Sequence, residues 1–110
     1  MSLADRHCQP VVSALDAGAV GALLPQVPGW AVEGGKLVRR FGFRNYYETI
    51  AFVNALAWFT HREDHHPELT VGYKECTVSY ATHSVGGALS DNDFICAAKA
   101  NALYARRAGA

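Results

Sequence analysis

Four of the five histidines in this sequence lie within a short stretch of the chain. They are His61, His65, His66 and His83. The unperturbed pKa of histidine is about 6.5, so its side chain can give and take protons near neutral pH. Two adjacent histidines directly before Pro67 are unusually placed for a packing role. We therefore consider this group a candidate centre for general acid–base catalysis.

Two other interpretations of these histidines remain open at this level. They could be surface side chains at helix and strand ends, where a C-terminal helix dipole favours a positive charge. They could also bind a metal, because His61 and His65 are four residues apart and can share one face of a helix. Asp64 or His83 could complete such a site, although the sequence contains no HExxH motif.

Other common catalytic patterns are missing from the sequence. It contains no GxGxxG, P-loop or GxSxG motif. The three cysteines, Cys8, Cys76 and Cys96, are widely spaced and form no CxxC, which excludes a disulfide framework and suits a reducing cytosol. We expect Cys76 to point into the core, so it is a poor candidate for a nucleophile.

The composition indicates a small self-associating domain. At 110 residues the chain has room for one domain, residues 1–110. Its ten basic and ten acidic residues cancel, which argues against binding nucleic acid or an anionic membrane. Half of the residues are hydrophobic, and surplus apolar surface is commonly covered by self-association.

The N-terminal half predicts two helices and a hairpin. We expect residues 1–10 to be a poorly ordered lead-in and residues 11–24 to form a helix that Pro25 ends. A hairpin follows over residues 30–41, turning at Gly34-Gly35. A second helix begins after Asn45, with Glu48 completing a capping box, and continues to about Asp64. Because this helix is apolar nearly all round, we expect it to be buried on several faces, under the sheet and near a subunit contact.

The C-terminal half predicts two strands and a last helix. The strands cover residues 69–73 and 76–83, and His83 lies on the more polar face of the second. Ser90 can cap the last helix, with Asp93 as its capping-box partner. The predicted fold is a single α+β domain of order α-β-β-α-β-β-α, with helices packed on one face of an antiparallel four-stranded sheet. The first residues contain no apolar stretch typical of a signal peptide, so we expect a cytoplasmic protein without membrane spans.

The spacing of the histidines resembles the pattern of the pterin-4a-carbinolamine dehydratase family. The pattern consists of a charged or histidine residue, three spacers, His-His-Pro, an aromatic residue, a further histidine and a later aspartate. The matching residues are His61, His65, His66, Pro67, Tyr73, His83 and Asp93. Short surrounding segments, such as Pro28-Gly29-Trp30 and Asn92-Asp93-Phe94, agree as well. The resemblance covers residues 20–103 and implies the same fold order.

The resemblance implies a lyase reaction. An aromatic amino acid hydroxylase leaves its tetrahydropterin as a 4a-hydroxy adduct, and the dehydratase removes water from it to give the quinonoid dihydropterin. The pterin is then the substrate, and no metal, nucleotide or other cofactor is required. Members of the family are homodimers or homotetramers. Others are non-catalytic binding proteins, namely a dimerisation cofactor of a transcription factor and Rubisco assembly chaperones, which tend to lose the catalytic motif.

The resemblance also assigns roles to individual residues. His65 and His83 would be the general acid–base pair, and His66 would orient the pterin. Asp93 would hold a histidine in one tautomer in addition to capping its helix, and Asp64 would help bind the pterin edge. Trp30 and Tyr73 are expected in the core rather than at the ligand.

Two departures from the family pattern affect these assignments. His61 occupies a substrate-binding position that is often Glu, so this chain has no carboxylate there. The loop of residues 86–89 is one residue longer than in close relatives, which could shift Asp93.

Overall fold

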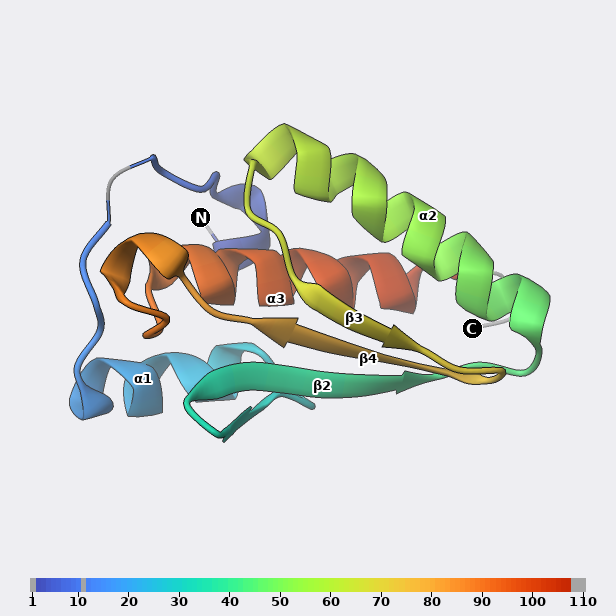
Figure 1. Ribbon diagram of the computed structural model, residues 1–110, viewed down its shortest axis with the longest axis horizontal. Coiled ribbons are helices and arrows are strands. Elements are labelled where there is room, and N and C mark those ends of the chain that lie inside the picture. Colours follow the sequence, from blue (N-terminus) through green and yellow to red (C-terminus); the bar gives the residue numbers. More distant parts are fainter. Residues whose placement is uncertain (1, 11, 108–110) are drawn as a thin grey trace.

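A computed structural model describes residues 2–10 and 12–107 of the chain. In chain order it contains α1 (Ala17–Leu23), β1 (Ala31–Glu33), β2 (Lys36–Gly42), α2 (Tyr46–Glu63), β3 (Glu68–Val71), β4 (Glu75–Tyr80) and α3 (Asp91–Ala105). The strands form one antiparallel sheet in the order β1-β2-β4-β3. Helices α2 and α3 pack against each other and against this sheet (Figure 1). The predicted α+β fold and its element order are confirmed.

The sheet is amphipathic, and its apolar face carries the core. Along β4, Cys76, Val78 and Tyr80 are buried while the residues between them are partly exposed. Their partners Leu37 and Phe41 on β2 are buried too, because paired residues of neighbouring strands share a face. Buried side chains of α2 and α3 close this core; they include Phe52, Leu56, Phe94 and Ile95. Trp30 lies in the core as expected.

The hairpin between β1 and β2 turns at the predicted glycines. Glu33 pairs with Lys36, which leaves Gly34 and Gly35 as a two-residue turn. Both glycines have positive φ, 57° and 80°. Two successive residues with positive φ form the type of turn whose twist matches that of the strands, so glycine is favoured at both positions.

Helix α2 begins as predicted but is buried along one stripe only. The Asn45 side chain accepts a hydrogen bond from the Glu48 N–H, as expected of a cap. The predicted capping box is not formed, because the Glu48 carboxylate accepts from the Arg44 backbone N–H rather than from that of Asn45. The buried residues of the helix are Thr49, Phe52, Leu56 and Thr60. The expectation of burial on several faces is therefore wrong for the single chain, in which Tyr47 and Trp58 are 82% and 62% exposed.

The first helix is shorter than predicted. Helix α1 covers only Ala17–Leu23, after Asp16 caps it by accepting from the Ala19 N–H. Residues 12–16 belong to no helix or strand, and the Leu15 N–H donates to the Leu89 carbonyl instead of joining a helix. This long-range hydrogen bond keeps Leu15 out of the helix, so α1 begins later than predicted and ends close to the predicted position. Val11 lies outside the described residues.

The expected lead-in is also ordered where the structure describes it. Leu3 is buried in a short 3-10 helix, Leu3–Asp5, that packs against α3. The Lys99 ammonium donates to the Ala4 carbonyl at 2.8 Å. The prediction of a poorly ordered segment failed because its partners come from the far end of the chain.

Two further predictions in the second half need correction. Strand β4 ends at Tyr80, and His83 belongs to a 3-10 helix, His83–Val85, rather than to the strand. The Thr82 N–H instead donates to the Ala88 carbonyl and closes the loop that includes Gly86 and Gly87. Tyr73 follows β3 in a turn and is 68% exposed, so it is not a core residue. No helix of the described part of the chain is long and apolar enough to cross a membrane.

Candidate active site

The end of α2 directs the two adjacent histidines toward the sheet. The helix ends at Glu63, and Asp64 adopts a left-handed conformation with φ 50° and ψ 43°. Asp64 is the one non-glycine residue with positive φ in the part of the chain described. This turn ends the helix and leads through His65, His66 and Pro67 into β3.

His65 is held between the core and α3. Its side chain is 11% exposed, and its ring stacks on that of Tyr80 with a centroid distance of 5.8 Å and an interplanar angle of 10°. Its Nε2 atom lies 2.6 Å from Oδ1 of Asp93, which is fully buried. The Asp93 carboxylate accepts this hydrogen bond, so Nε2 carries the proton and a neutral His65 keeps Nδ1 free to accept one.

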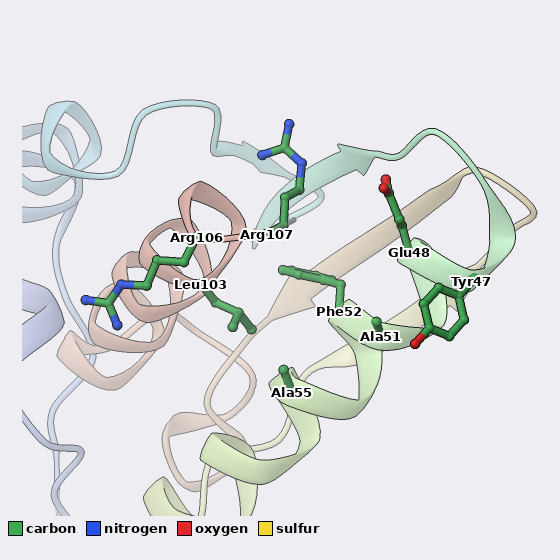
Figure 2. Close-up of a pocket in the computed structure, with 8 residues that line it drawn as sticks. All are labelled: Tyr47, Glu48, Ala51, Phe52, Ala55, Leu103, Arg106 and Arg107. Carbon is green, nitrogen blue, oxygen red and sulfur yellow. The ribbon is translucent and has the colours of Figure 1, made fainter. Parts of the chain in front are cut away.

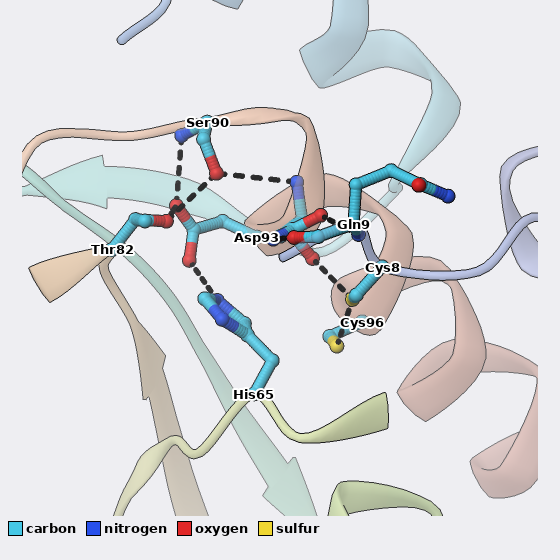
Figure 3. A network of polar contacts seen from close by, with 8 residues as sticks. Cys8, Gln9, His65, Thr82, Ser90, Asp93 and Cys96 are labelled. Atoms are coloured by element: carbon cyan, nitrogen blue, oxygen red, sulfur yellow. Dashed lines mark hydrogen bonds and ion pairs between the residues drawn. The ribbon is translucent and has the colours of Figure 1, made fainter. Parts of the chain in front are cut away.

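The other oxygen of Asp93 is saturated by hydrogen-bond donors (Figure 3). Oδ2 accepts from the Thr82 hydroxyl at 2.7 Å and from the Ser90 backbone N–H at 2.9 Å. The Thr82 and Ser90 hydroxyl oxygens are 2.7 Å apart, and the single Thr82 proton goes to Asp93, so Ser90 is the donor of this pair. Two buried residues, Thr82 and Ser90, thus stabilise the carboxylate and leave Oδ1 for His65.

The same contacts form the predicted capping box of α3. The Ser90 side chain accepts from the Asn92 N–H while the Asp93 side chain accepts from the Ser90 N–H. A capping residue is therefore also the partner of a site histidine, as the residue pattern allowed. The loop of residues 86–89 leaves Asp93 in contact with His65.

An open cleft of about 280 Å³ brings the candidate residues together. It is lined by Gln9, Pro10, Asp64, His65, His66, Ala81, Thr82, His83, Ser84 and Asn92. Of the six predicted site residues, four line this cleft, while Asp93 lies behind His65. His61 is on the exposed surface of α2 and does not line the cleft. His66 and His83 are exposed, in contrast to His65.

The cleft also contains residues that the sequence did not point to. Gln9 and Pro10 come from an N-terminal strap, which we define as residues 7–10. The Asn92 side-chain amide holds this strap by accepting from the Gln9 N–H and donating to the Gln9 carbonyl, both at 2.9 Å. No local sequence pattern marks the strap. Thr82 is a different case, because its position directly before His83 could have indicated that it lines the cleft.

A second anchor of the strap is the nearly buried carboxylate of Glu63. It accepts from the Cys8 backbone N–H and contacts His7 Nδ1, both at 2.8 Å. Burial acts to raise the pKa of Glu63, but the hydrogen bonds from Cys8 and His7 and the nearby charge of Lys99 outweigh it and lower the pKa below its usual value. The ionised form of Glu63 is therefore the one that holds the strap.

Another depression lies between α2 and the end of α3 (Figure 2). Its volume is about 200 Å³, and its walls are mainly the side chains of Ala51, Phe52, Ala55 and Leu103. Arginines and a tyrosine border it, but it contains no histidine. We place the candidate site in the histidine cleft because acid–base groups converge there.

The metal interpretation finds no ligand set in the residues described. No group of three or more His, Cys, Asp or Glu side chains is arranged there to hold an ion. His65, one of the two spaced histidines, is bonded to Asp93 through Nε2.

Comparison with known proteins identifies the family. The family model described as pterin 4 alpha carbinolamine dehydratase matches residues 13–103. A protein of Dechloromonas aromatica (strain RCB), named "Putative pterin-4-alpha-carbinolamine dehydratase", is 51% identical over 105 residues, covering 93% of each chain. One of the same name from Stenotrophomonas maltophilia (strain R551-3) is 56% identical over 106 residues, covering 92% of this chain and 90% of the relative. The chain belongs to the pterin-4-alpha-carbinolamine dehydratase family, as its histidine pattern indicated.

Two solved structures share the fold. The transcriptional coactivator/pterin dehydratase from Brucella melitensis has a TM-score of 0.79 at 27% identity, covering 83% of this chain and 98% of its own. A pterin dehydratase-like protein identified as a RuBisCO assembly factor in the alpha-carboxysome has a TM-score of 0.60 at 26% identity. It covers 69% of this chain and 89% of its own. The fold thus occurs both in a protein named as a dehydratase and in an assembly factor.

Proposed function

We propose that this protein is a 4a-hydroxytetrahydropterin dehydratase that works by histidine acid–base catalysis. The observation that carries the proposal is the convergence of His65, His66 and His83 on one cleft, with Asp93 bonded to His65. In this reaction the C4a–O bond breaks and the hydroxyl leaves as water after taking a proton. The N5–H proton is removed, and its electron pair forms the C4a=N5 double bond. Each positioned acid or base typically contributes a factor of about 10²–10⁴ in rate.

The two histidines of the proton transfers occupy different environments. We assign His65, through its free Nδ1, and His83 as the acid–base pair, because both line the cleft and come from different elements. Asp93 fixes the tautomer of His65. His66 and Asp64 then orient the pterin, whose ring edge offers both hydrogen-bond donors and acceptors. We assign no role to His61, because it lies outside the cleft.

The activity can be tested directly. Purified protein is mixed with chemically generated 4a-hydroxytetrahydropterin, and dehydration is followed by ultraviolet absorbance. We expect the wild type to accelerate the reaction and His83→Ala to be at least 100-fold slower. His61→Ala is the matched control and should match the wild type. A folded wild type that gives no acceleration would refute the proposal.

The biological setting follows from the reaction. We propose that the protein works in the cytoplasm, returning the pterin of an aromatic amino acid hydroxylase to its recycling pathway. We also propose a homodimer or homotetramer, supported by the exposed Tyr47 and Trp58 on α2. Light scattering should then give a mass above that of the monomer. A monomer at micromolar concentration would contradict this part.

A second candidate function is a non-catalytic binding role. The names of the two solved structures, a transcriptional coactivator and a RuBisCO assembly factor, favour considering it. The two roles can be distinguished by expressing the His83→Ala variant in a strain that lacks this protein. If His83→Ala restores the phenotype fully, the binding role is the relevant one; if it fails, the enzyme role is.

A further inference from the structure

The strap and α3 each carry a cysteine at the point where they touch. Cys8 of the strap and Cys96 of α3 are free thiols whose Sγ atoms lie 3.4 Å apart (Figure 3). They are 88 positions apart in the sequence, so only the fold brings them together. The third cysteine, Cys76, is buried in β4 and lies outside this network.

The two sulfur atoms are near enough for a disulfide to form after a small movement. An S–S bond is about 2.05 Å long, so the sulfur atoms have to approach each other by roughly 1.4 Å. Cys96 is fixed in a fully buried stretch of helix, while Cys8 belongs to neither helix nor strand. A small movement of the strap can therefore supply the approach.

The protonation of the pair indicates which sulfur reacts first. The hydrogen bond with Cys8, together with burial, raises the pKa of the Cys96 thiol, so Cys96 keeps its proton. Cys8 is only partly buried and is the one that a small oxidant can reach. Thiol oxidation begins at the accessible sulfur and ends at a neighbouring resolving thiol.

We propose that Cys8 and Cys96 are a redox modification site that hydrogen peroxide converts to an intramolecular disulfide. In the first step the Cys8 sulfur attacks peroxide, giving a sulfenic acid and one water. In the second step the Cys96 sulfur attacks that sulfenic sulfur, and its hydroxyl leaves with the Cys96 proton as a second water. In total the two thiols lose two electrons, which reduce the peroxide to water.

The modification has a structural consequence at the cleft. Gln9 and Pro10, which follow Cys8 directly, form part of the cleft wall. In the reduced protein the strap is held by its hydrogen bonds with the Asn92 amide and to the Glu63 carboxylate, which can open individually. The disulfide ties the strap to α3 covalently and fixes that wall. The proposal concerns the thiols alone and does not depend on the proposed reaction.

Peptide mapping tests the site. The protein is treated with peroxide, unfolded, alkylated and digested without reductant. We expect a peptide that links Cys8 to Cys96, with only Cys76 alkylated, and full reversal by dithiothreitol. Cys76→Ala is the matched control and should form the same link, whereas Cys8→Ser should not. The oxidised protein should melt roughly 10 °C higher, because the link closes a long loop.

Hydrogen exchange measures the effect on the strap. The backbone amides of residues 7–10 should exchange more slowly after oxidation, and Cys96→Ala should remove this change. The proposal is overturned if peroxide leaves all thiols free, if Cys8 ends as a sulfinic acid beside a free Cys96, or if the product is a disulfide between two chains.

Discussion

The two walls of the histidine cleft differ in how firmly they are held. On the buried wall, His65 is bonded to Asp93, and Asp93 to Thr82 and Ser90, all within the core. On the open wall, His66 is exposed just after the end of α2, and His83 is exposed in the short 3-10 helix His83–Val85. The buried wall is thus pre-organised before a ligand arrives, while the open wall can adjust to one. Mutations should therefore separate stability from activity.

The largest effect is expected at the centre of the buried wall. Asp93→Ala removes the partner of His65, leaves the Thr82 and Ser90 donors unpaired and breaks the α3 cap. We expect the free energy of unfolding to fall by about 3–5 kcal/mol, with at least a 100-fold loss of dehydration rate. Urea denaturation measures the free energy of unfolding, and the dehydration assay measures the rate. Asp91→Ala, a half-exposed carboxylate of the same helical turn, should change stability by less than about 0.5 kcal/mol. Equal effects of the two substitutions would contradict the comparison.

The open wall should show the opposite pattern. His83→Ala is expected to reduce the dehydration rate by about 10²–10⁴, since it removes a proton-transfer group. Because His83 is exposed, the free energy of unfolding should change by less than about 0.5 kcal/mol. Ser84→Ala in the same 3-10 helix is the control for local geometry. A large loss of stability in His83→Ala would mean that the open wall is as structural as the buried one.

A smaller effect is expected from a single hydroxyl of the buried wall. Thr82→Val keeps the size of the side chain but removes its hydrogen bonds to Asp93 and Ser90. We expect a loss of about 1–3 kcal/mol in stability and roughly a 10-fold lower kcat, with KM little changed. Thr82→Ser restores the hydroxyl and should recover kcat. If Ser and Val behave alike, the methyl group matters and the hydrogen bond does not.

The smallest effect concerns the strap and depends on pH. The pKa of Glu63 is lowered in the folded protein, so its contribution to stability is complete above the unfolded value of about 4.3 and is lost as pH falls through the folded value. The difference in unfolding free energy between the wild type and Glu63→Gln should therefore be constant near neutral pH and shrink below about pH 4. Glu75→Gln, exposed on β4, is the control. A difference that grows on acidification would reverse the assigned sign.

Local patterns predicted the parts of the fold that local interactions determine. The glycine hairpin turn, the Asn45 cap and the Ser90–Asp93 capping box all involve residues within a few positions of one another. The histidine spacing identified the family, and four of the six predicted site residues line the cleft.

The errors fall where distant segments meet. The ordered strap and the shortened α1 depend on contacts with α3, Glu63 and Leu89, which no local pattern encodes. For the same reason no local pattern pointed to Gln9 or Asn92 as part of the cleft. The exposed face of α2 is a different case, because its hydrophobic residues suggested burial that a single chain does not provide.

The left-handed backbone conformation of Asp64 makes a change of chirality possible at this position. The direction in which His65 and His66 leave α2 depends on the backbone of this one residue, at φ 50°. A residue of D chirality adopts positive φ without the steric penalty that an L residue bears. Chemical synthesis of this chain with D-aspartate at position 64 should therefore preserve the path of the two histidines, while the Asp64 side chain that lines the cleft is redirected.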